Sequence, residues 1–310
     1  DGLGLVGGWC RGEYQSPADR SADGACRTVY DRAEGQTRDL MTEAADAKEP
    51  QGGDQQRIGD LYASFMDGEA IRQRGLTPLL EELADIDAAD TPDALAAVLG
   101  TLQRTGIGGG VGLYVDTDSK NSSRYLPHLS QSGIGLPAES YFRDAHPAEL
   151  LAAYPPHNPA MSALVYGGTP GEHAETAAGI VALETKIAAA HWDVVKRRDA
   201  DLTYNLRTFA EVTDEAPGFA WTRWLNSLGA TDEQAAELVV RQPDVLTAFA
   251  ALWGGESLDV WKNWTRWRLI HRRAFLLTDE LVAEDFDFYG RRLSGTEEIR
   301  DRWKRAVSLV

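Results

Sequence analysis

Apolar residues recur at helical spacing along most of this chain, and that pattern limits its fold more than any other feature. Between Ile58 and Phe65 the spacing is i, i+3, i+4 and i+7, which predicts a helix over about 55–75. Thr91 followed by Pro92 is typical of a helix start, because the hydroxyl can cap free amides and proline fits the first turn. The sequence therefore predicts a mainly α fold.

Further helices are predicted from the same kinds of evidence. Thr231 and Gln234 have the spacing of a capping box. Apolar periodicity predicts two longer helices, over about 172–192 and about 257–289. Prolines and glycines leave the stretch 145–169 unassigned.

One stretch departs from helical spacing. Residues 110–116 and 124–129 are short runs that favour β structure, and a polar, turn-rich run separates them. This predicts a small β hairpin near 111–129. Pro127 favours an edge strand, because proline has no amide hydrogen to donate to a neighbouring strand.

The charge of the chain excludes one class of partner. Its formal net charge is −17, whereas nucleic-acid binding depends on basic side chains that displace counterions from phosphates. We therefore expect no nucleic-acid partner. No apolar run approaches the roughly 18 residues of a membrane span, and no secretory leader opens the chain. The first residue is Asp1 rather than Met, so a leader could have been removed by processing. The sequence therefore leaves both a cytoplasmic and a secreted soluble protein open.

Catalytic and metal-binding motifs are absent from the sequence. None of the histidines is followed by Glu or by a second His four residues later, which excludes the zinc helix His-Glu-x-x-His. No serine lies in Gly-x-Ser-x-Gly, and no lysine follows a glycine as in a phosphate-binding loop. Cys10 and Cys26 are too few for a thiolate zinc site. They could pair, but we expect free thiols.

Two clusters have both a structural and a functional interpretation. Trp261, Trp264 and Trp267 lie three apart, and at this spacing in a helical chain core packing is favoured over an aromatic ligand wall. The segment Lys196–Asp201 combines three cations with two acids. It fits a solvated helix end, and paired arginines at the edge of a cleft can also hold a peptide carboxylate.

Several segments, taken together, resemble the amino-terminal half of the neprilysin and endothelin-converting-enzyme family of zinc metalloendopeptidases, especially its bacterial members. Their order and spacing span nearly the whole chain. The segments are Gly7-Gly-Trp9, Pro17-Ala-Asp-Arg20, Tyr30-Asp-Arg-Ala-Glu34, Val115–Asn121, Gln131–Pro137, Leu183-Glu184, Arg197–Asn205, Phe286–Gly290 and Trp303-Lys-Arg305.

The resemblance implies a multi-helical lid lobe that caps a thermolysin-like catalytic lobe and encloses a chamber for oligopeptides. On this basis 1–310 is a single peptidase amino-terminal domain that lacks its C-terminal helices and the whole catalytic lobe, with a poorly matched opening segment, 1–16. In the family the zinc ligands and the general base belong to the second half. We therefore expect zinc in the full-length enzyme, none bound by this chain, and no catalytic residue in it.

The resemblance also suggests where a substrate is held. Arg197, Arg198 and Asn205 lie in the matched segment that can face the boundary between the lobes, and they are the candidate substrate-binding residues. At the positions of two subsite arginines of neprilysin this chain has Ala22 and Tyr30, so that subsite is not carried over.

Three functions stay open at this point. The chain is the lid part of a zinc peptidase and inactive alone, or a noncatalytic helical module that binds a peptide or partner, or the remnant of a disrupted peptidase gene. A lobe separated from its partner lobe should expose an apolar face. We therefore expect the isolated chain to be marginally stable or to self-associate.

Overall fold

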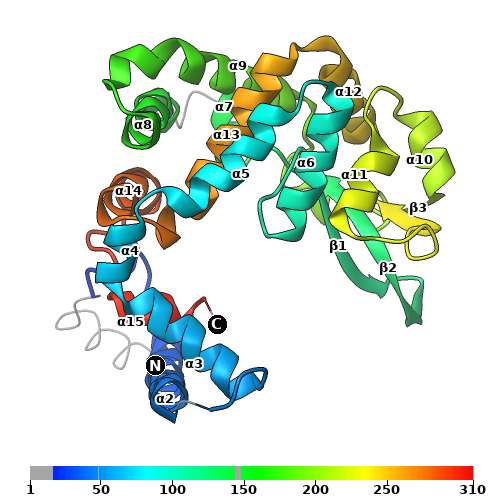
Figure 1. Cartoon of the computed structure of the whole chain (residues 1–310). Helices are drawn as coiled ribbons and strands as arrows, with labels where there is room; N and C mark the ends of the chain where they lie inside the picture. The colour runs from blue at the N-terminus through cyan, green and yellow to red at the C-terminus, as the bar shows by residue number, and fades with distance from the viewer. Residues whose placement is uncertain (1–16, 48, 144–147, 310) are drawn as a thin grey trace, which may run out of the picture. The chain divides into compact units, whose positions relative to one another are not determined.

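The computed structural model describes residues 17–47, 49–143 and 148–309, and the chain divides into two compact units (Figure 1). The first unit combines the residues up to Gly75 with those from Leu276 onward. The second unit is the continuous segment Leu76–Phe275, so in sequence it is inserted into the first. The opening segment 1–16, with Cys10, lies outside the described residues, and Cys26 is exposed.

The first unit is helical. Gly59 allows its two longest helices to pack closely, because a Cβ at this position would lie 2.5 Å from the carbonyl oxygen of Ala44. Buried side chains from three of the helices, with Phe65 among them, form its core. The elements of this unit are α2 (Ala25–Ala47), α3 (Asp54–Met66), α4 (Gly68–Arg74), α14 (Asp279–Asp285), the π-helix η4 (Phe286–Leu293) and α15 (Arg302–Val307).

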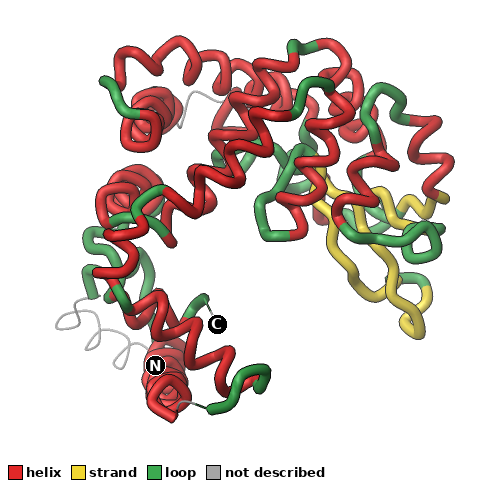
Figure 2. The backbone as a smooth tube through the Cα atoms, viewed as in Figure 1, coloured by secondary structure: helices red, strands yellow, loops and turns green. Residues whose placement is uncertain are grey.

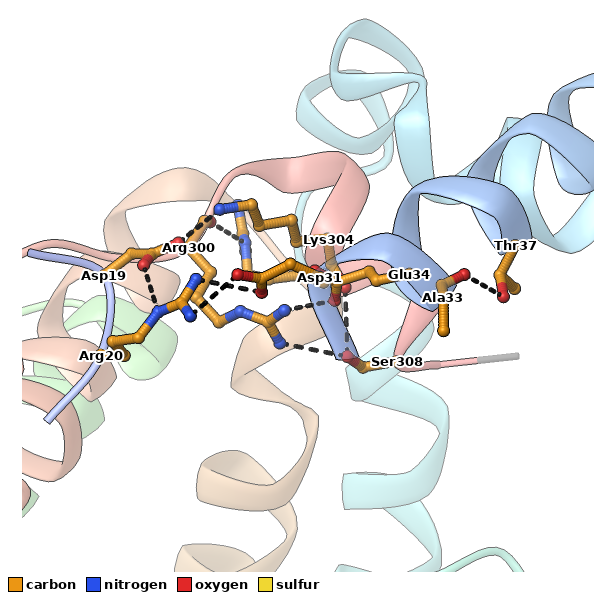
Figure 3. A network of polar contacts seen from close by, with 10 residues as sticks. Asp19, Arg20, Asp31, Ala33, Glu34, Thr37, Arg300, Lys304 and Ser308 are labelled. Atoms are coloured by element: carbon orange, nitrogen blue, oxygen red, sulfur yellow. Dashed lines mark hydrogen bonds and ion pairs between the residues drawn. The ribbon is translucent and has the colours of Figure 1, made fainter. Parts of the chain in front are cut away.

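Charged side chains connect the beginning and the end of the chain within this unit (Figure 3). The ammonium of Lys304 donates to the carboxylate of Asp19 over 2.6 Å. Arg300 donates to the carboxylate of Glu34, which is 4% exposed. A buried carboxylate is costly unless it is paired, so the Arg300 contact stabilises the packing of the C-terminal segment against α2.

The second unit contains most of the helices and all of the strands of the described chain (Figure 2). Gly100 brings α6 against α11, because a Cβ there would lie 2.2 Å from the carbonyl oxygen of Trp224. The helices are α5 (Thr77–Ala88), α6 (Pro92–Arg104), α7 (Ser140–Arg143), α8 (Ala148–Tyr166), α9 (Ala174–Ala190), α10 (Phe209–Glu215), α11 (Trp221–Leu228), α12 (Pro243–Gly255) and α13 (Leu258–Arg273), with short 3-10 turns η1 (Pro170–His173) and η2 (Lys196–Arg198).

A mixed sheet of four strands lies in the second unit, in the order β1-β2-β4-β3. β1 and β2 form the predicted antiparallel hairpin, β2 pairs with β4 in parallel, and β3 pairs with β4 antiparallel. The strands are β1 (Val111–Asp118), β2 (Asn121–Gln131), β3 (Asn205–Thr208) and β4 (Glu237–Val240). β2 is an inner strand, so the prediction of an edge strand at Pro127 is wrong, and its pairing with β4 begins only at His128. Pro127 therefore pairs with β1 alone, and its missing amide hydrogen leaves no bond to β4 unmade.

Buried tryptophans lie in the core of the second unit. Trp261, Trp264 and Trp267 are each at most 2% exposed, so the interpretation of this spacing as core is confirmed. Trp261 packs edge-on to Trp264, with ring centroids 5.4 Å apart. Such contacts add specific geometry to the large apolar area that each ring buries.

A buried polar chain crosses this core. The indole of Trp267 donates to the hydroxyl of Tyr154 over 2.9 Å, and that hydroxyl donates to the carboxyl of Glu184 over 3.0 Å. Gly135 runs directly beside this chain, because a Cβ there would lie 1.9 Å from the Tyr154 hydroxyl oxygen. The segment Gln131–Pro137, which contains Gly135, is thus closely packed against the core at this glycine.

The mainly helical prediction is confirmed, and three details are corrected. The helix predicted over 55–75 is interrupted at Asp67, whose side chain caps α4 by accepting from the amide of Ala70. The helix predicted over 257–289 ends at Arg273. The capping bonds between Thr231 and Gln234 both form, but the chain continues through turns into β4 rather than into a helix.

Candidate functional site

Two of the three predicted site residues line one hollow in the second unit. This hollow, here called the arginine pocket, has a volume of about 370 Å³. It lies between the sheet and the loop that follows α9, which runs from Trp192 to Tyr204. Its lining residues are Tyr114, Ser130, Val194, Arg197, Arg198, Arg241 and Gln242.

The loop is fastened to the sheet at both ends. At its start the side-chain amide of Gln131 both donates to the carbonyl and accepts from the amide of Trp192, over 3.0 and 2.9 Å. At its end the hydroxyl of Tyr204 donates to Asp118 over 2.9 Å. The arginines of the loop therefore extend from a segment whose two ends are held in place.

The acids of the loop are occupied by its own backbone. Asp193 accepts from the amides of Val195 and Lys196, each over 2.8 Å, and the second of these bonds is the main cause of the lowered pKa of Asp193. Asp199 accepts in the same way from the amides two and three residues later, each over 3.0 Å. These carboxylates shape the turns of the loop.

Lys196, the first cation of the segment, has other contacts. Its ammonium lies 3.7 Å from the ring centroid of Trp192 and 3.8 Å from the carboxylate of Asp244. The three cations of the segment therefore have different surroundings. Lys196 contacts Trp192 and Asp244, whereas Arg197 and Arg198 line the arginine pocket.

The sheet forms the floor of the arginine pocket. Tyr114 and His128 are paired across β1 and β2, and their rings stack with centroids 5.2 Å apart. Strand alternation places Ser130 on the same face. His128 is 4% exposed, and burial, followed by the charge of Arg241, lowers its pKa. It is therefore uncharged at neutral pH, and the positive charge of this face comes from the arginines.

Arg241 is a lining residue that sequence reasoning missed. It directly follows β4, its backbone amide donates to the carbonyl of Leu129, and its guanidinium donates to the hydroxyl of Thr203 over 3.3 Å. The only sequence signal was the apolar run Leu238–Val240 before it. Because β4 was not predicted, nothing in the sequence placed Arg241 near Arg197.

Asn205 lies apart from the two arginines and does not line the arginine pocket. Its side-chain amide donates to the carbonyls of Leu202 and Val240, over 2.8 and 3.0 Å. Both hydrogens of the amide are thus used to join the end of the loop to β4.

A second, more apolar hollow lies on the other side of the hairpin, with a volume of about 610 Å³. Val115 and Tyr125 line it from the strands, and Leu228 lines it from the end of α11. Tyr125 is 74% exposed.

No group of three or more His, Cys, Asp or Glu side chains suited to hold a metal ion occurs among residues 17–47, 49–143 and 148–309. The described histidines contact other groups separately; for example, a ring nitrogen of His191 forms a hydrogen bond with the carbonyl of Ser132 over 3.1 Å.

In the part of the chain that the structure covers, no helix is long and apolar enough to cross a membrane.

Known proteins resemble this chain over its whole length. The zinc metalloprotease Zmp1 of Mycobacterium tuberculosis, solved with an inhibitor, is 59% identical and superposes on all of this chain with a TM-score of 0.97, while the chain covers 47% of that protein. The same protein in its open state gives a TM-score of 0.91. PepO of Lactobacillus rhamnosis, at 20% identity and a TM-score of 0.78, shares the fold.

Curated relatives agree with these structures. Endothelin-converting enzyme 1 of Cavia porcellus is 28% identical over 199 residues, which are 63% of this chain and 26% of that enzyme. The chain thus spans about half of the solved relative and about a quarter of this enzyme. The family model of the amino-terminal part of peptidase family M13 matches residues 6–310, and the chain therefore belongs to peptidase family M13, as its N-terminal domain.

Proposed function

We propose that this chain is the amino-terminal, chamber-forming part of a zinc metalloendopeptidase that hydrolyses oligopeptides, and that it is inactive alone. The observation that carries the proposal is the match to Zmp1, a zinc metalloprotease, over all of this chain at 59% identity. A second half would hold zinc and its ligands, and zinc bound there would supply the Lewis acid and the activated water that peptide hydrolysis needs.

The residues of this chain would then bind and orient a peptide. Arg197 and Arg198 are the candidates, because guanidinium groups bind carboxylates with two parallel hydrogen bonds. Asn205 has a different role in this proposal. Since its amide is bound to two backbone carbonyls, it would hold the loop that carries the arginines.

A chimera tests this proposal directly. The part of Zmp1 that this chain covers is replaced by this chain, and hydrolysis of a fluorogenic oligopeptide is followed with and without a zinc chelator. We expect chelator-sensitive hydrolysis by the chimera and none by this chain alone. A folded, zinc-loaded chimera without activity would contradict the proposed role.

The arginine pocket also supports a second candidate, a noncatalytic peptide-binding module. The same experiment separates the two, because a binding module requires no catalytic half. A chain that binds peptides tightly but cannot support hydrolysis in the chimera would favour the module.

A further inference from the structure

More than half of the arginines among the described residues form ion pairs with carboxylates, and the three in the arginine pocket are among those that do not. Arg124, for comparison, lies 2.8 Å from the carboxylate of Asp118 and 2.7 Å from that of Glu237. Within the described part of the chain, no carboxylate lies at ion-pair distance from Arg197, Arg198 or Arg241. None of the acidic side chains that the structure describes thus pairs with these three cations.

The acids nearest in sequence have other partners. The carboxylates of Asp193 and Asp199 accept from backbone amides of their own turns, and that of Asp244 accepts from the indole of Trp192 over 2.7 Å. Rotation of one of these carboxylates toward the guanidiniums would break bonds that shape the loop. The arginine pocket therefore holds three guanidiniums that have no ion-pair partner among the described residues.

The arrangement suits a ligand with several oxygen atoms. Three guanidiniums around one hollow repel each other, and an anion between them removes that repulsion. Each guanidinium presents a planar set of donors that matches the oxygens of a carboxylate or a phosphate. Tyr114 and Ser130, whose side chains carry hydroxyl groups, also line the hollow.

Part of the site is fixed before any ligand binds. Arg241 is held by strand pairing and by the hydroxyl of Thr203, and Tyr114 is held against the buried ring of His128. A binding group that is already positioned loses less conformational freedom when the ligand arrives. Arg197 and Arg198 are exposed and can close over the ligand from the loop.

We infer that the arginine pocket is an oxyanion-binding site, in which Arg197, Arg198 and Arg241 together hold a carboxylate or a phosphate group. A carboxylate would come from an acidic residue or the C-terminus of a peptide. A peptide as the source of the carboxylate rests on the proposed function. Binding of free phosphate does not depend on that function.

Calorimetric titration of the purified full chain tests this inference. The probes are a short peptide that ends in Asp with a free carboxylate, the same peptide with Asn and a C-terminal amide, and inorganic phosphate. The variants are Arg241→Gln and the double variant Arg197→Gln with Arg198→Gln. Arg272→Gln is the matched control, because Arg272 is exposed near the end of α13 and does not line the pocket.

We expect the acidic peptide or phosphate to bind to the wild-type chain and the neutral peptide not to bind. Loss of charged hydrogen bonds should weaken binding roughly tenfold or more in both pocket variants. The control should stay within about twofold, because a distant surface charge is screened by salt. The double variant changes only exposed side chains, so it separates a binding effect from a folding defect.

Two results would overturn the inference. One is absence of binding by both anionic probes, and the other is equal weakening in Arg272→Gln, which would show a general charge effect. Binding of the peptide identifies a peptide carboxylate as the ligand, and binding of phosphate alone identifies a phosphate. Because the titration uses no catalytic half, its failure is distinguishable from failure of the chimera to hydrolyse peptides.

Discussion

Replacement of Glu184 by Gln should change how the stability of the second unit depends on pH. Glu184 is fully buried beside Tyr154, and burial is the main cause that raises its pKa from 4.5 to about 7. In the unfolded chain the carboxyl ionises near its ordinary pKa. Between these two values unfolding therefore releases a proton. The contribution of Glu184 to stability is greatest at low pH and falls as the pH rises toward 7.

The size of this effect follows from the two pKa values of Glu184. Each unit of pKa difference corresponds to about 1.4 kcal/mol. Integration between pH 5.5 and pH 8 gives a loss of about 2 kcal/mol in the wild-type chain that comes from this carboxyl. Glu184→Gln has no proton to release. The free energy of unfolding of the variant minus that of the wild type should therefore be larger by about 2 kcal/mol at pH 8 than at pH 5.5, so the variant gains stability relative to the wild type as the pH rises.

Urea unfolding followed by tryptophan fluorescence provides the assay, because the buried tryptophans lie in the same unit. Both chains are measured at several pH values from 5.5 to 8. Glu175→Gln, an exposed change near the start of the same helix, is the control and should leave the difference constant. A difference between Glu184→Gln and wild type that does not change with pH would refute the argument, because it would mean that the folded carboxyl ionises as it does in the unfolded chain.

Three further predictions concern packing, the hairpin and association. Gly100→Ala should lower the free energy of unfolding by about 2–3 kcal/mol, because the new methyl group meets the backbone of α11. Its control is Gly179→Ala, whose new methyl group meets no atom within 4 Å. In urea titrations of both variants, Gly179→Ala should raise the free energy of unfolding by roughly 0.5–1 kcal/mol. Hydrogen bonding, chiefly from the amide of Lys120, lowers the pKa of Asp118 from 3.8 to about 2. The stabilisation from ionised Asp118 should thus be complete above about pH 4 and be lost as the pH falls through 2. In an acid titration, the free energy of unfolding of Asp118→Asn should lack this pH-dependent loss. Light scattering should show concentration-dependent self-association of the isolated chain, since large apolar side chains such as Val29, at 71% exposure, lie on its surface; a monodisperse monomer at all concentrations would refute this.

Local sequence signals predicted the parts of the fold that depend on local structure. The cap at Thr91 is present, with its hydroxyl accepting from the amide of Ala94 over 3.2 Å. The hairpin and the helix α9 also agree with their patterns, because apolar periodicity and turn residues act within a few positions. The tryptophan core followed from helical spacing in the same way.

Structure that depends on distant contacts could not be predicted. α8 contains three prolines, which argue against a helix locally, but Tyr154 and Met161 are fully buried in the packed unit and stabilise it. β4 is a run of four residues whose pairing with β2 crosses more than a hundred positions of sequence. The same long separation hid Arg241 from the site prediction.

The two predicted arginines come together because one segment holds them. Arg197 and Arg198 are adjacent in sequence, so a single motif identified both, and they share one hollow in the structure. Asn205 belongs to the same motif but is bound to backbone carbonyls, because the chain enters β3 at that residue. Whether the two arginines contact substrate stays a prediction.

The intact mass of the gene product in its own cells tests the central claim most directly. The product is recovered with an antibody against this chain and measured by mass spectrometry. If the chain is the N-terminal domain of a zinc metalloprotease, the mass should be near double the 33.9 kDa of this chain, since it covers 47% of Zmp1. A product with a mass near 33.9 kDa, and no second chain bound to it, would contradict the account.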